Sequence, residues 1–178
     1  CLTAHGRIPL AIRGSGTVHL RPTGDTLNIT IEKRDLNIYE GPEILTVVLM
    51  APDRSKLKRV TLPDDESEGK AGISKNIQSA TIAVPVEMDG VYQLRFSPGN
   101  GDQVFGFSTT CPTYVIEAPI FVNDSSLAGD VYFLPPEGEF TISAEAVHES
   151  GIQSLPLQDG NGTVLHTFEL EKLGTPSE

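Results

Sequence analysis

The sequence contains no tryptophan, and only two of its 178 residues are cysteine. Membrane-spanning helices need about eighteen consecutive apolar residues, and the most apolar stretch, 44–51, is interrupted by Thr46 and followed by Pro52. We therefore predict no transmembrane segment. With four tyrosines and seven phenylalanines, the chain is also poor in the aromatic rings that stack on sugars, which counts against a large aromatic binding platform.

Positive charge is also scarce. The chain has 13 Lys and Arg residues against 24 Asp and Glu, a formal net charge of -11. A surface of that sign repels phosphate backbones, so we predict no nucleic-acid partner. The same charge disfavours anionic membranes and polyanionic glycans unless a bound cation bridges the like charges.

The two cysteines, Cys1 and Cys111, have neither the paired spacing of zinc ligands nor a nearby histidine. Three interpretations remain open. A first-position cysteine fits the lipid-modified residue of a processed bacterial lipoprotein, although an excised fragment can begin anywhere. Alternatively, Cys1 and Cys111 form a disulfide in an oxidising compartment, or they are two unrelated thiols.

Apolar residues alternate with polar ones from Thr17 onward, and turn signals recur about every ten residues, which is typical of an all-β protein. Two segments lack this alternation: the turn-rich stretch 33–43 and the acidic stretch 64–75, which we expect to be a loop. We predict an antiparallel β-sandwich of the jelly-roll or immunoglobulin-like type. Its expected strands are 17–20, 27–31, 45–50, 57–62, 78–86, 91–96, 104–108 and 114–118.

The strand pattern restarts near Pro119, and Asp159-Gly160-Asn161-Gly162 is the strongest hairpin signal of the chain. We predict an N-terminal extended segment at 1–16, a β-sandwich domain at 17–118 and a second β domain at 119–178. The second domain has too few predicted strands for a complete sandwich. Its expected strands are 120–122, 130–134, 140–147, 152–157 and 164–170.

Three stretches carry a resemblance to a known group of proteins. The first is VYFLPPEGEFTI at 131–142, in which a strand ends in a Pro-Gly turn. The second is LQDGNGTVL at 157–165, a D-x-N-G hairpin, and the third is GVYQLRF at 90–96, a G-x-Y-x-L-x-F strand. Together they resemble the accessory β-sandwich modules of secreted bacterial polysaccharide-active proteins. The resemblance implies an extracellular or cell-surface location and a non-catalytic role beside polysaccharide or a neighbouring protein domain.

Four aromatic residues are candidates for contact with a sugar. Tyr39 lies in a polar loop and Tyr114 lies next to Pro112, so we expect both to be exposed. Phe105 and Phe107 belong to the stretch 104–114, where a substrate-facing surface could lie. The alternative for these two phenylalanines is a place in the core.

We predict no required cofactor, although calcium is an option, because hard oxygen ligands are abundant in the loops. The two candidate groups are Asn100 with Asp102 and Asp159 with Asn161, and the alternative for each is a hairpin that needs no ion. The acidic run 64–68 is expected to be a solvated surface. Three N-x-S/T sequons at Asn28, Asn123 and Asn161 are possible glycan acceptors.

No catalytic signature is present. The sequence lacks a G-x-S-x-G elbow, and its four histidines lie far apart without a ligand-pair spacing. We therefore expect no enzyme activity and favour a non-catalytic extracellular module that binds carbohydrate or acts as a scaffold. The alternative is a structural subunit of a surface assembly or filament, in which copies exchange strands along an open sheet edge.

Overall fold

The computed structural model describes residues 7–67, 72–117, 137–142 and 154–169. The chain separates into two compact units; the described residues up to Glu117 belong to the first, and those from Glu137 onward belong to the second. Among the described residues, no helix is long and apolar enough to cross a membrane. All regular structure among the described residues is antiparallel β-strand, so the prediction of an all-β protein is confirmed.

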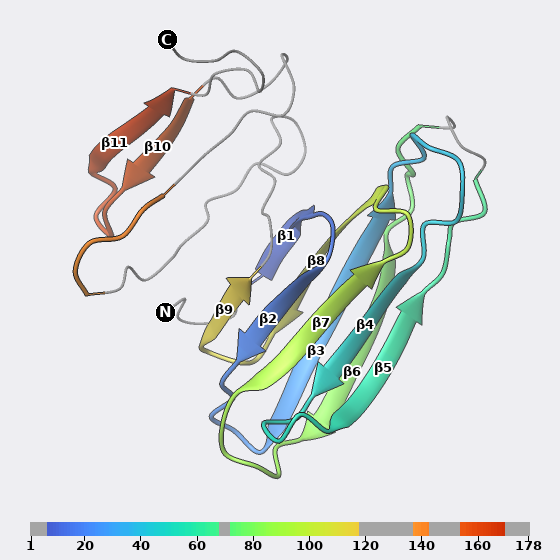
Figure 1. Ribbon diagram of the computed structural model, residues 1–178, viewed down its shortest axis with the longest axis horizontal. Coiled ribbons are helices and arrows are strands. Elements are labelled where there is room, and N and C mark those ends of the chain that lie inside the picture. The colour runs from blue at the N-terminus through green and yellow to red at the C-terminus, as the bar shows by residue number, and fades with distance from the viewer. Residues whose placement is uncertain (1–6, 68–71, 118–136, 143–153, 170–178) are drawn as a thin grey trace. The chain divides into compact units, whose positions relative to one another are not determined.

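The first unit is a sandwich of a four-stranded and a five-stranded sheet (Figure 1). The four-stranded sheet has the order β1-β8-β3-β6, and the five-stranded sheet has the order β5-β4-β7-β2-β9. Successive strands alternate between the sheets except for the β4–β5 hairpin. The strands are β1 (Arg7–Ile12), β2 (Gly16–Leu20), β3 (Thr26–Asp35), β4 (Leu45–Met50), β5 (Lys56–Leu62), β6 (Gln78–Pro85), β7 (Tyr92–Pro98), β8 (Gln103–Thr109) and β9 (Tyr114–Glu117).

The core lies between these two sheets because alternate residues of each strand point inward. In β3, Leu27, Ile29 and Ile31 are fully buried while the residues between them are not. Phe96 of β7 stacks on Phe105 of β8 with a centroid separation of 4.8 Å, which joins the two sheets. Each fully buried aliphatic or aromatic side chain contributes about 1.5–3 kcal/mol, so this apolar layer is the main stabilising element of the first unit.

The predicted strands of the first unit agree closely with the observed ones, but its start does not. We expected residues 1–16 to precede the sandwich, whereas β1 is a sandwich strand that pairs with β8, with Arg7 opposite Ser108. The alternation of Ile8, Leu10 and Ile12 is a strand signal that the prediction overlooked. Pro9 lies within this alternation and weakens the signal. Proline is nevertheless tolerated in edge strands, and β1 is an edge strand.

In the second unit, the described strands are β10 (Ser154–Gln158) and β11 (Val164–Glu169), which pair antiparallel as a hairpin. The D-G-N-G turn lies between them, as the sequence predicts. The expected strand 140–147 is not seen in its described part, because residues 140–142 are not in a strand. The expected strands 120–122 and 130–134 lie outside the described residues.

Candidate functional site

The site begins with two charged residues at the end of β3. The inward alternation of Leu27, Ile29 and Ile31 continues through Lys33 and Asp35, so both charged side chains enter the interior. Lys33 is 0% exposed and Asp35 is 1% exposed. Burying charges is costly unless they are paired and hydrogen-bonded, so this end of the sandwich needs compensating partners.

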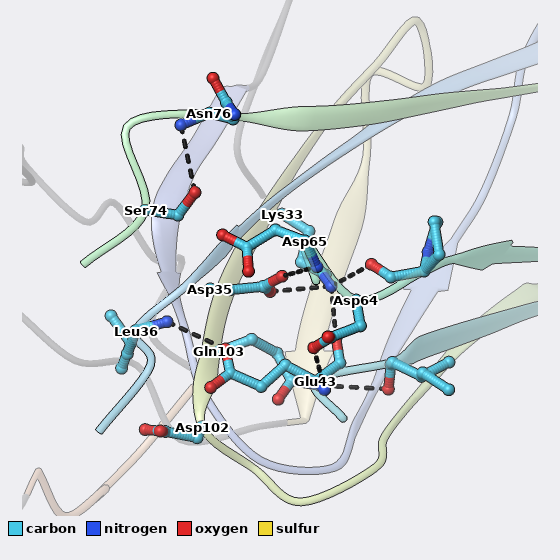
Figure 2. Close-up of polar contacts among 12 residues, drawn as sticks. Lys33, Asp35, Leu36, Glu43, Asp64, Asp65, Ser74, Asn76, Asp102 and Gln103 are labelled. Carbon is cyan, nitrogen blue, oxygen red and sulfur yellow. Dashed lines mark hydrogen bonds and ion pairs between the residues drawn. The ribbon is translucent and has the colours of Figure 1, made fainter. Parts of the chain in front are cut away.

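Lys33 has three such partners (Figure 2). Its ammonium lies 2.7 Å from Asp35 Oδ1, donates to the carbonyl oxygen of Pro63 at 2.5 Å, and also donates to the carbonyl oxygen of Glu43. These oxygens come from β3, from the loop before β4 and from the residue that follows β5. The Lys33 ammonium thus connects three chain segments in the interior of the first unit.

Asp35, Asp64 and Asp65 bring carboxylate oxygens within 4.8 Å of one another. Their oxygens also accept backbone N–H groups: Asp64 Oδ1 from Glu43 at 2.6 Å, and Asp35 Oδ2 from Asp65 at 3.0 Å. Burial raises the pKa of Asp35, and the hydrogen-bonded Lys33 ammonium opposes that rise. Lys33 therefore supplies positive charge at the place where these three carboxylates meet.

A second pair of acidic side chains, Glu43 and Asp102, lies beside this group, and both are buried. Glu43 accepts the backbone N–H groups of Leu36 and Asn37, each at 3.0 Å. Burial and, next, the neighbouring Asp102 carboxylate raise the pKa of Glu43 to about 7. The Glu43 carboxyl consequently carries a proton over much of the pH range below 7.

Asp102 completes the support of the loop between β3 and β4. Its Oδ2 accepts the backbone N–H groups of Ile38 at 2.6 Å and Tyr39 at 2.8 Å, and its Oδ1 accepts from the Arg13 guanidinium at 3.3 Å. The Asn100 side chain donates to the carbonyl oxygen of Gly41 and accepts the N–H of Asp102. Together with the two bonds to Glu43, these hydrogen bonds hold the backbone of residues 36–41, and those to the Asp102 carboxylate are charge-assisted.

This hydrogen-bonded loop presents apolar side chains outward. Among the described residues, Tyr39 has the most exposed aromatic side chain, with 63% of its surface exposed. Ile38 is also exposed, and Asn37 donates to the carbonyl oxygen of Gly72, which ties the neighbouring loop with its exposed Ile73 to the same end. We call Ile38, Tyr39 and Ile73 the apolar tip.

Of the four aromatic residues predicted to contact a ligand, only Tyr39 is exposed. Tyr114 is 5% exposed and packs edge-on against Phe107, with ring centroids 5.3 Å apart, so the expected exposure of Tyr114 is wrong. Phe105 and Phe107 are also buried between the sheets, which rules out direct contact between either ring and a ligand in this structure. For Phe105 and Phe107 this is the alternative that the sequence left open, a place in the core, whereas the turn and proline signals near Tyr114 do not reveal the inward orientation of its ring.

The residues predicted to bind calcium serve hairpins and loops. Asn100 and Asp102 hold the loop 36–41, as described above. In the second unit, Asp159 Oδ1 accepts the N–H groups of Asn161 at 2.8 Å and Thr163 at 2.9 Å, and these backbone hydrogen bonds lower the pKa of Asp159. This geometry is the alternative that the sequence left open, a hairpin closed by its own side chain.

The predicted modification sites are partly described. Cys111 has a buried, free thiol that donates to the carbonyl oxygen of Thr113 at 3.0 Å, and burial raises its pKa. Asn28 is exposed on β3, and Asn161 is exposed at the tip of the β10–β11 hairpin. Cys1 and Asn123 lie outside the described residues, so the lipid, disulfide and glycan predictions for them stay predictions.

Sequence reasoning missed Lys33, Asp35 and Glu43. Lys33 and Asp35 had a usable signal, since they continue the period-two phase of Leu27, Ile29 and Ile31. Glu43 had none, because the neighbouring Asp102, which raises its pKa, is distant in the sequence. The acidic run 64–68 was expected to be solvated. Asp64 and Asp65 are instead half-buried and accept backbone N–H groups, from Glu43 and Ser67 respectively, so for these two residues the expectation is wrong.

No protein-family model matches this sequence, and no curated protein is significantly similar to it.

Proposed function

We propose that this chain is a non-catalytic carbohydrate-binding module of a secreted or surface-exposed protein, with Tyr39 as its principal contact. The observation that carries the proposal is the support of an exposed tyrosine by a buried carboxylate: Asp102 accepts the N–H of Tyr39 at 2.8 Å while the ring points into solvent. An aromatic ring held on a fixed backbone binds a sugar face at low entropic cost.

The buried polar residues support this proposal because they are occupied by structural contacts. The carboxylates of Asp35, Glu43 and Asp102 accept backbone N–H groups or pair with Lys33 and Arg13. This arrangement suits a scaffold for a loop.

The proposal is tested by affinity electrophoresis of the full chain in gels that contain neutral polysaccharides such as xylan, glucomannan or β-glucan. We expect retardation by at least one polymer and its loss in Tyr39→Ala. The matched control is Tyr114→Phe, which removes a hydroxyl from a buried tyrosine and leaves Tyr39 unchanged. Retardation of Tyr39→Ala equal to that of the unmodified chain would overturn the role of Tyr39.

A structural subunit is the second candidate, and one observation in the second unit favours it. The β10–β11 hairpin has no further strand paired to it among the described residues, and Val164 and Leu165 are exposed on it. A two-stranded hairpin is marginally stable alone, and open edges invite strand addition. Light scattering on a sizing column distinguishes the candidates: a monomer near 19.1 kDa contradicts the assembly, and a concentration-dependent polymer supports it.

A further inference from the structure

The outer face of the five-stranded sheet differs in charge from the rest of the chain. Three adjacent strands, β5, β4 and β7, carry the sequences KLKRVTL, LTVVLM and YQLRFSP. They contain Lys56, Lys58, Arg59 and Arg95 and no acidic residue, in a chain whose formal net charge is -11. These three strands thus carry four cations in an otherwise acidic molecule, but Lys58 lies opposite the core residue Leu49 and does not share the outer face.

The register of the strands places two of these cations on one flat face. Arg59 of β5 and Arg95 of β7 both lie opposite Val48 of β4. The neighbours Val47 and Leu94 point into the core, so the side chains of Arg59 and Arg95 point outward, and both are exposed. Two strand spacings separate them, which is about 10 Å. Lys56 lies opposite Met50 in the next row. We call Arg59, Arg95 and Lys56 the basic patch.

Protection of the sheet edge explains only part of this arrangement. Lysines on an edge strand prevent pairing with other chains, and Lys56 and Lys58 suit that role on β5. Arg95 lies on β7, with β4 between it and the edge strand. Its guanidinium donates to Gln93 Oε1 from Nε at 3.3 Å and from Nη2 at 2.7 Å, which holds the side chain along the sheet surface.

Two acidic side chains lie to the sides of the patch. Arg95 lies opposite Thr17 of β2, which in turn lies opposite Glu117 of β9. Glu117 pairs with His19 at 3.0 Å. Asp53 lies in the turn before β5 and accepts the N–H of Ser55. Between them the outer face offers hydroxyl and amide groups beside the cations, from Thr46, Thr61, Ser97 and Gln93.

We propose that the basic patch binds an acidic polysaccharide, through carboxylate or sulfate groups on Arg59 and Arg95 and sugar hydroxyls on the neighbouring polar side chains. This inference rests on the proposed carbohydrate-binding function and names a second surface and a ligand class for it. Guanidinium groups bind carboxylate and sulfate oxygens in a bidentate manner. The patch acts locally because the Debye length is about 8 Å at physiological ionic strength, so distant acidic residues are screened.

The test measures retardation of the full chain in gels containing polygalacturonate, a uronic-acid polymer, with neutral dextran as the reference. We expect the unmodified chain to be retarded by polygalacturonate, and Arg59→Ser/Arg95→Ser to bind about tenfold more weakly or worse, because two charge-assisted contacts are lost. Arg59→Lys/Arg95→Lys should fall between them, since charge remains while the bidentate geometry is lost. Arg21→Ser/Lys75→Ser removes two exposed cations elsewhere and should bind like the unmodified chain.

Several results would overturn the inference. Equal retardation of Arg59→Ser/Arg95→Ser and the unmodified chain would do so, as would equal weakening in Arg21→Ser/Lys75→Ser, which would indicate a net-charge effect. Binding of polyglutamate as tight as that of polygalacturonate would replace the polysaccharide by an acidic peptide. Retardation by neutral polymers alone, dependent on Tyr39, would contradict the basic patch and leave the proposed function standing, whereas binding to no polysaccharide of either kind would contradict both.

Discussion

Lys33 and Asp35 form a buried ion pair on one strand, with 2.7 Å between Lys33 Nζ and Asp35 Oδ1. The two residues are separated by one position, so both point inward, and the pair connects the apolar core to the loops that end the sandwich. Removal of one partner leaves the other charge buried without compensation, which makes the pair the most sensitive point of this end of the protein.

We expect Lys33→Met to lower the free energy of unfolding by about 3–5 kcal/mol, because Asp35 would remain buried without its ammonium partner. Urea denaturation followed by circular dichroism measures this loss. The control is Lys75→Met, an exposed lysine for which a change within about 0.5 kcal/mol is expected. Equal stability of the two variants would show that Lys33 is not paired in solution.

The stability of the first unit should depend on pH through Glu43. Its pKa is about 7 in the folded chain, above the ordinary 4.5 that it has when unfolded, so the folded state holds this proton more tightly. The associated stability is fully present below pH 4.5 and is lost as the pH rises to about 7. Urea midpoints between pH 4 and pH 8 should fall over that window, and Glu43→Gln, which stays neutral, should flatten the fall. An unchanged profile in Glu43→Gln would assign the dependence to other groups.

Asp102→Asn should loosen the loop that carries Tyr39. The substitution removes the negative charge that accepts the Ile38 and Tyr39 N–H groups, and lost hydrogen bonds to a charged acceptor cost about 1–3 kcal/mol. Hydrogen exchange should accelerate at these two amides, with the core strands unaffected. Asp25→Asn, at an exposed acid, is the comparison. Unaltered exchange at Tyr39 would contradict the role of Asp102 in ordering the loop.

Cys111 should react slowly with alkylating reagents in the folded chain. Its thiol is buried and its pKa is raised by burial, so little thiolate is available at pH 8. Peptide mass spectrometry after a short iodoacetamide pulse should find Cys111 unmodified in buffer and modified in urea. Rapid modification in buffer would show that the segment around Cys111 opens readily.

Calcium should not change the melting temperature of the unmodified chain. Three carboxylates meet at Asp35, Asp64 and Asp65, but the Lys33 ammonium already supplies positive charge there. A ligand that binds only the folded state raises its stability, so thermal melts with calcium and with EDTA give a direct test. A higher melting temperature in calcium would show that a cation binds despite Lys33.

The sequence predicts the sandwich well and the polar site poorly, for a physical reason. Strand 45–50 is read from its own alternation and the Pro52 turn, and the structure places β4 there. The same local rule extends to Lys33 and Asp35, since their phase follows that of Ile31. No local rule predicts the raised pKa of Glu43, because the fold brings Asp102 beside it from 59 positions away.

Tyr39 and Tyr114 show the same division. Both stand near turn-forming residues, so the sequence predicts exposure for both. Tyr39 is exposed because its loop lies beyond the sheets, while Tyr114 is the first residue of β9 and its ring packs on Phe107. The pairing of β9 with β2, which places Tyr114 opposite Leu20, decides the orientation of the Tyr114 ring. These two strands lie far apart in the sequence, so no local signal predicts their pairing.

The pairing of β1 with β8 determines how this protein can be shortened for laboratory work. β8 lies between β1 and β3, and its residues are mostly buried. A chain that began at Thr17 would uncover one side of β8 and turn a covered apolar strand into an open edge, which promotes aggregation. Solubility during expression therefore depends on keeping residues 7–12. This segment pairs with β8 and not with the strands that carry the basic patch or flank the apolar tip.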